Sequence, residues 1–436
     1  MDILKGLIQK LSIVKDNSAF LVPVILALIA GLLFIPTQLM SSKLKKQMEQ
    51  ESISKRARQL KSMTQDVVPR EQWKRMAERQ EVYANDVNQV ELLSKQSSQR
   101  ELLSYKIFPK PKDTSTLVFK EFGELYRKAV DELIVNVNAY DCPSETELMR
   151  VLESSSEKFR SSRTYSSTEP SSLTTLSRTS LTRLGEVENK IVDEICRERA
   201  KSISFYVNPV DLSGYEYWEG YKYDVGIEKA VEDCWYYQLA YWVIEDVFDT
   251  IGAYNVGSNS VLTSPVKRLL GVNFNPGKGR SRRPRGSYIV MRDAVTSNVD
   301  RPAYVLSPQE ALIEPCTGRS CNDDIDVIHF NVIVLVSADA VLPFMQQLCS
   351  AKEHKFAGYS GDEQKRTFKH NQIAILENKI RSIDRGDQDH LYYRYGEDAV
   401  VELDLICEYI YNKKGYDEIE PESVKNSLRA GVTTTR

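Results

Sequence analysis

Histidine is scarce in this sequence, and its cysteines avoid the spacings that metal sites use. The chain has four histidines and seven cysteines, without a C-x-x-C pair or a mixed Cys/His cluster. Protein zinc sites depend on such spacings, so we expect neither a metal site nor a metal cofactor. The net charge is −3, whereas typical nucleic-acid binders have an excess of basic residues. Nucleic acid is therefore not an expected partner.

Catalytic motifs are missing as well. The sequence contains no G-x-S-x-G and no H-E-x-x-H pattern. The segment 269–279 superficially resembles a phosphate-binding loop, but Gly271 and Gly277 enclose five residues instead of four. Gly279 also stands where a Ser or Thr would hold magnesium. We therefore expect a non-enzymatic protein with no catalytic residues and no cofactor.

Charged residues are absent between Asn17 and Ser42. An apolar run over 19–40 would span a ~30 Å hydrocarbon core at ~1.5 Å rise per residue. The cationic segment 43–46 follows as an interfacial anchor. The pattern predicts a retained single transmembrane helix over 19–40, with the lipid bilayer as a partner. The amphipathic tail 1–18 is expected to be an interfacial helix or a docking peptide for a cytoplasmic partner, and the alternative is a solvated tail.

The distribution of charged residues on its two sides bears on the orientation of this predicted transmembrane helix. More lysine and arginine residues follow it than precede it, which by the positive-inside rule places the C-terminal side in the cytoplasm. The rule weakens when a long domain follows the span, because such domains translocate largely regardless of charge.

Glycine is absent from residues 42–104, which are rich in Lys, Glu, Gln and Arg. Apolar residues recur there at heptad spacing, in two registers separated by Pro69. This pattern predicts a coiled coil over 42–104; the alternative is an amphipathic helix that folds back on the protein's own domain. The expected interface residues are Ile53, Leu60, Met63, Trp73, Met76, Tyr83, Val87 and Val90, with Gln80 as a polar member of the second register.

Residues 106–253 mix expected helices and strands. A helix is expected after residue 112, followed by a strand over 133–137, and a long aromatic helix over 228–252. Between them, 154–182 is dominated by Ser and Thr, which bury too little apolar surface to order a chain. We expect this segment to be a disordered insertion.

The C-terminal part, 254–425, has the clearest pattern. Strands are expected over 327–336, 373–383 and 399–411, and a helix over 340–351. Earlier strands over 267–274 and 288–292 are expected to join them. An antiparallel sheet with a helix on one face is the economical packing, so we expect an α+β fold with a ferredoxin-like sandwich domain, followed by a flexible tail over 426–436.

Two local features are candidate sites, a cysteine pair and a basic loop. Cys316 and Cys321 flank a glycine and could close a small disulfide loop in an oxidising compartment; the alternative is two free thiols. A basic loop is a candidate contact for lipid headgroups, an acidic partner or a polyanion, and the alternative is a solvated loop. Its residues are Lys278, Arg280, Arg282, Arg283 and Arg285.

The order of these segments resembles the inner-membrane alignment proteins of type IV pilus machines, the PilO/PilN kind, and the GspM/GspL-type components of type II secretion. The span 19–40, the heptads 53–90 and the segment 328–411 carry this resemblance. The chain departs from the family's pattern in its greater length, its Ser/Thr-rich insertion and the aromatic helix 228–252.

The resemblance implies a place for the protein. It would sit in the bacterial inner membrane with a cytoplasmic N-terminus and a periplasmic C-terminal domain. It would act as a scaffold, as a homodimer or as a heterodimer with another single-span coiled-coil protein. The alternative function is a membrane-tethered periplasmic sensor or ligand-binding module.

Overall fold

The computed structural model describes residues 18–50, 53–65, 70–164, 178–223, 226–275, 300–307, 311–313, 316–360, 364–426 and 428. The chain divides into two compact units, Met1–Val87 and Asn88–Arg436. We call the second unit the body.

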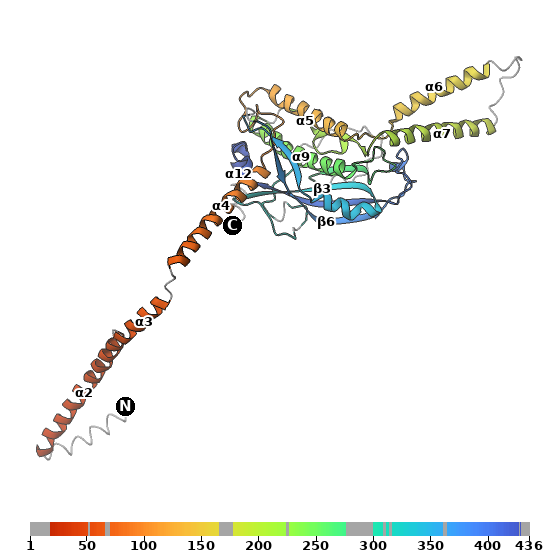
Figure 1. The fold of residues 1–436 in the computed structure, drawn as a ribbon. Helices are drawn as coiled ribbons and strands as arrows, with labels where there is room; N and C mark the ends of the chain where they lie inside the picture. Colours follow the sequence, from red (N-terminus) through yellow and green to blue (C-terminus); the bar gives the residue numbers. More distant parts are fainter. Residues whose placement is uncertain are drawn as a thin grey trace. The chain divides into compact units, whose positions relative to one another are not determined.

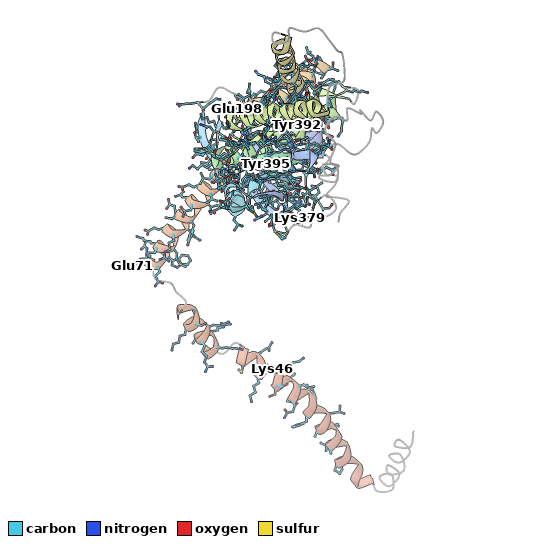
Figure 2. All side chains as sticks on the ribbon, turned by 90° about the vertical axis from the view of Figure 1, so that its right-hand side faces the viewer. Lys46, Glu71, Glu198, Lys379, Tyr392 and Tyr395 are labelled. Atoms are coloured by element: carbon cyan, nitrogen blue, oxygen red, sulfur yellow. The ribbon has the colours of Figure 1, made fainter. Side chains whose placement is uncertain are left out.

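The first unit is helical where it is described. It contains α2 (Ser18–Gln50), α3 (Ile53–Gln65) and most of α4 (Arg70–Ser97). Figure 2 labels Glu71 of α4 among the side chains drawn as sticks, and no residue of α4 is buried.

The predicted transmembrane helix over 19–40 is not supported. Helix α2 occupies that segment, but the described part of the chain holds no helix that is both long and apolar enough to cross a bilayer. Helix α2 does not end where the apolar run ends. It continues to Gln50 through Lys43, Lys45 and Lys46, so apolar and cationic residues share one helix.

The body combines helices with a mixed sheet, so the α+β part of the expected fold class is correct. Its longest helix is α9 (Ile227–Tyr254), as the aromatic pattern predicted, and its aromatic residues Trp235, Tyr237 and Trp242 are buried. The other helices that the described residues form, beside the short 3-10 turns, are α5 (Thr116–Asn136), α6 (Glu145–Thr164), α7 (Arg178–Ser202), α8 (Tyr215–Glu219), α11 (Val341–Leu348) and α12 (Lys413–Tyr416).

Five strands form the main sheet, in the order β1-β2-β3-β7-β6. These are β1 (Tyr206–Val207), β2 (Val266–Asn273), β3 (Ile325–Ser337), β7 (Val400–Asn412) and β6 (Ile373–Ser382); β4 (Lys352–Phe356) and β5 (Arg366–His370) form a separate hairpin. The strongly apolar β3 lies at the centre and pairs antiparallel with β7 along its whole length. This fits a strand that is buried on both faces.

One face of the sheet carries most of the core. Side chains of β3 at alternate positions, such as Phe330, Val332 and Val334, belong to the same apolar cluster as α9. Figure 1 shows α9 lying over the sheet and α5 lying beyond α9. A second, smaller cluster contains Leu335, Tyr206 and Tyr395. Residues on both sides of position 254 thus build one sheet and its core.

The expected antiparallel sheet with a helix in its crossover is present. Strands β3, β7 and β6 are neighbours that pair antiparallel, and α11 lies between β3 and β6 along the chain. A ferredoxin-like fold has the chain order β-α-β-β-α-β. Among the described residues no strand follows β7, and the strand on the other side of β3 is β2, which precedes it in the chain. The chain order therefore differs from that of a ferredoxin-like fold, whereas the antiparallel pairing agrees with the prediction.

Helices occupy both ends of the segment that we expected to be disordered. Helix α6 reaches Thr164 and α7 begins at Arg178, while 165–177 lie outside the described residues. The two helices lie side by side, and Arg199 of α7 pairs with Glu147 of α6 at 2.7 Å. The strand expected over 133–137 is also wrong, because α5 continues to Asn136.

Candidate functional site

An apolar seam runs along α4. Its residues are Trp73, Met76, Gln80, Tyr83, Val87 and Val90, and we call them the α4 seam. The five apolar members are between 53% and 69% exposed. Their 3,4 spacing places them on one helix face, which therefore offers a continuous surface to another helix.

The first heptad register lies elsewhere. Leu60 is 64% exposed on α3, while the side chains of Ile53 and Met63 lie outside the described residues. Helices α3 and α4 are separate elements. The structure therefore brings Trp73, Met76, Tyr83, Val87 and Val90 onto one helix, but does not join them to Leu60 on a continuous one.

The C-terminal end of α4 is built into the body. Ser98 is fully buried, and its hydroxyl oxygen accepts hydrogen bonds from the backbone N–H of Asn412 (2.7 Å) and the side-chain amide of Gln372 (2.8 Å). The Asn412 side-chain amide donates to the Ser94 hydroxyl at 2.6 Å. We call Ser94–Arg100 the root of α4. Each of these bonds fixes the root to β7 or to the residue before β6.

Arg100 completes this attachment from inside the core. Its guanidinium lies 2.8 Å from Asp246 of α9 and donates to the Tyr409 hydroxyl of β7, also at 2.8 Å. The Tyr409 hydroxyl lies 2.7 Å from the second Asp246 oxygen. Glu245, at the edge of this network, also contacts Arg100. One buried cation thus links the root to α9 and β7.

Arg100 and Asp246 each stabilise the charged form of the other. Burial opposes both charges, but Asp246 raises the pKa of Arg100, and Arg100 lowers the pKa of Asp246. Both groups are therefore ionised in the folded protein. A buried ion pair is costly to break, since removing one partner leaves an uncompensated charge.

Two histidines of the β4–β5 hairpin border this network. His370 lies 3.5 Å from Asp246, and its ring is 5.1 Å from that of His354. Burial lowers the pKa of His370 to about 3, with Arg100 and His354 adding to the effect, so this imidazole is neutral. Neither of its ring nitrogens has a hydrogen-bond partner among the described residues.

The C-terminal segment closes over the root. Lys414 of α12 pairs with Glu91 of α4 at 2.8 Å. Gly415 approaches the root so closely that a Cβ atom there would lie 2.6 Å from the Lys95 carbonyl oxygen. Tyr416, the last residue of α12, donates a hydrogen bond to the buried Asp326. Burial and Asp326 raise the pKa of nearby Glu420 to about 7.

The described cavities lie away from this network. One, of about 600 Å³, is lined by Arg197, Leu262, Arg385, Tyr393, Arg394, Tyr395, Gly396, Glu397 and Asp398, and Tyr395 is labelled in Figure 2. A shallower one, of about 360 Å³, lies beside Tyr140 and Arg199. Neither of these two cavities is lined by Arg100, Asp246 or His370.

The remaining predicted site residues are two cysteines and the basic loop. Cys316 is exposed, and both it and Cys321 are free thiols, so the structure has no disulfide between them. The Cys321 sulfur contacts the backbone of Val327 instead. The basic loop of Lys278, Arg280, Arg282, Arg283 and Arg285 lies outside the described residues.

Sequence reasoning missed the root entirely. Arg100 and Ser98 sit in a polar stretch where neither stands out, and their partners lie 145 to 314 positions away. The one available signal was Asp246, a carboxylate between the buried Val243 and Val247 of an apolar helix. A charge in such a place calls for a buried partner.

The chain matches no protein-family model, and comparisons with curated proteins and with solved structures found no similar protein.

Proposed function

We propose that this protein is a non-enzymatic scaffold that assembles with another helix through the α4 seam. The observation that carries the proposal is the exposure of the five apolar seam residues, each more than half exposed on a helix with no buried side chain. An apolar stripe at heptad spacing is stable in water when a partner helix covers it.

The root gives this seam a defined base. The last turns of α4 belong to the body, and Arg100, Ser98 and Gly415 hold them through buried contacts. An assembly formed through α4 would therefore be coupled to the α+β body by packed, hydrogen-bonded residues. A scaffold needs such a connection between its assembly surface and its folded domain.

The setting in a type IV pilus or type II secretion platform, and the periplasmic location, stay predictions that rest on the resemblance alone. The alternative function, a ligand-binding module with the aromatic helix lining its pocket, has less support. The aromatic side chains of α9 fill the core, and α9 lines neither of the two described cavities.

Light scattering coupled to size-exclusion chromatography of the full-length protein tests the proposal. The wild type is expected to elute above the monomer mass of 49.8 kDa, alone or with a bound chain. Tyr83→Asp places a charge in the seam and is expected to abolish the assembly, whereas Asn85→Asp, on the opposite face of α4, is expected to keep it. A monomeric wild type that also retains no other chain from its native extract would contradict the proposal.

A further inference from the structure

The α4 seam is symmetric about its own middle. Trp73 and Val90 lie at equal distances from the midpoint between Glu81 and Val82, as do Met76 and Val87, and as do Gln80 and Tyr83. A second copy of the helix, turned end for end, would therefore place each of these residues opposite its counterpart. No seam position would be left without a facing residue.

The sizes of the facing side chains are complementary in this arrangement. Trp73 would face Val90 of the second copy, and Met76 would face Val87. A large residue meets a smaller one in both layers, which is how side chains interdigitate at the density of protein interiors. In the two central layers Gln80 would face Tyr83, and the amide and the hydroxyl can bond to each other.

Charges beside the seam decide between the two directions. Arg79 and Asp86 occupy the position just before a seam residue in successive heptads, and both are exposed. In an antiparallel pair these positions face each other across the interface, so Arg79 would meet Asp86 of the second copy, twice by symmetry. The exposed residues Ala77 and Ala84 would face each other on the other flank and allow close approach.

A parallel pair of identical helices has the opposite charge pattern. There, Asp86 would face the residue five positions later in the second copy, which is Glu91. Two like-charge contacts would form, only partly relieved by the pairing of Glu91 with Lys414. Arg79 would face Ala84 and gain no charged partner.

We propose that the partner of the α4 seam is a second copy of this chain in antiparallel orientation, with Trp73 packed on Val90 and Arg79 paired with Asp86. This inference rests on the proposed scaffold function and names the partner of that same surface. The inference is based on the six layers of facing seam residues and on the charges that flank the seam of α4.

Charge reversal at Asp86 distinguishes the two directions, measured as the dissociation constant of the full-length protein by sedimentation velocity. In the antiparallel pair Asp86→Arg turns two attractions into two repulsions and is expected to weaken association about tenfold. The double variant Arg79→Asp/Asp86→Arg restores both pairs and is expected to recover wild-type association. In a parallel pair Asp86→Arg would meet Glu91 and strengthen association, which would overturn the inference.

Disulfide trapping supplies a second readout. In a Cys316→Ser background, the full-length variant Met76→Cys/Val87→Cys is expected to form a bond between residue 76 of one copy and residue 87 of the other. Met76→Cys alone is expected to stay uncrosslinked, because the two positions 76 would lie roughly 16 Å apart along the axis. A 76–76 bond in the single variant would show a parallel pair.

The outcomes also separate this inference from the proposed function. If the seam binds a different chain, and Tyr83→Asp abolishes that binding, the scaffold function stands and self-association is overturned. If the wild type binds neither itself nor another chain, both are overturned.

Discussion

The guanidinium of Arg100 lies 2.8 Å from the carboxylate of Asp246, and the two side chains are 2% and 1% exposed. The pair joins the root of α4 to α9, 146 positions later in the chain. It therefore connects the element that carries the seam to the helix that fills the core.

Removing Asp246 should strongly destabilise the body. Asp246→Ala leaves the Arg100 charge buried without its main partner, and we expect a loss of about 3–5 kcal/mol in the free energy of unfolding. Urea denaturation of the full-length protein measures it. Asp249→Ala is the matched control, because it removes the same charge from an exposed position of α9 and should change stability little. Equal effects of both variants would show that the buried pair has no special role.

Acid should destabilise the body through His370. Burial lowers its folded pKa to about 3, whereas an unfolded histidine titrates near ~6.5. Between these values the unfolded state binds the additional proton, so stability is present above pH ~6.5 and is lost as the pH falls toward 3.

Replacing the histidine tests this titration. His370→Gln should remove roughly 2 kcal/mol of the stability difference between pH 6.5 and pH 5. Denaturant unfolding at the two pH values measures it, with His390→Gln as a control for a less buried histidine. An unchanged pH dependence in His370→Gln would assign the acid loss to other groups.

A rise in pH should destabilise the body through Glu420. Burial and Asp326 raise the folded pKa of Glu420 to about 7 from the 4.5 of a free glutamate. The folded state therefore holds the additional proton between these values, and the stability from Glu420 falls as the pH rises from 4.5 to 7. Glu420→Gln should be more stable than the wild type at pH 8 and gain little at pH 4.5. Glu418→Gln, whose side chain is 78% exposed, is the control.

Filling the space at Gly415 should loosen the root. A Cβ atom there would lie 2.6 Å from the Lys95 carbonyl oxygen and 2.7 Å from the Cβ of Ser98. Since both neighbours belong to the root, Gly415→Ala must displace it, and we expect a loss of about 1–3 kcal/mol. At Gly220 the nearest atom to an added Cβ is 3.8 Å away, so Gly220→Ala should cost less. Thermal unfolding of the two variants compares them.

Local patterns in the sequence predicted individual elements well. The apolar run of β3 and the alternation of β7 predicted both strands, and the aromatic stripe predicted α9. Periodicity does not show which strands pair, so it could not predict that β2 lies beside β3 or that the chain order differs from that of a ferredoxin-like fold. The β-branched end of α5 misled the prediction of a strand at 133–137, because packing of Val130 and Ile134 in the core outweighs propensity there.

The candidate site was predictable only in part. The seam on α4 follows from spacing along a single helix, which a sequence displays directly. The root depends on contacts between residues such as Ser98 and Asn412, which are 314 positions apart. Such contacts are set by the tertiary fold, and no local pattern encodes them.

The claim that the α4 seam is covered by another helix is tested most directly by hydrogen exchange of the full-length protein. We predict that backbone amides of 73–90 exchange slowly in the wild type, become faster on dilution, and exchange rapidly at every concentration in Val87→Asp, while the amides of β3 stay protected in both. Rapid exchange of 73–90 in the concentrated wild type, equal to that of Val87→Asp, would contradict the account.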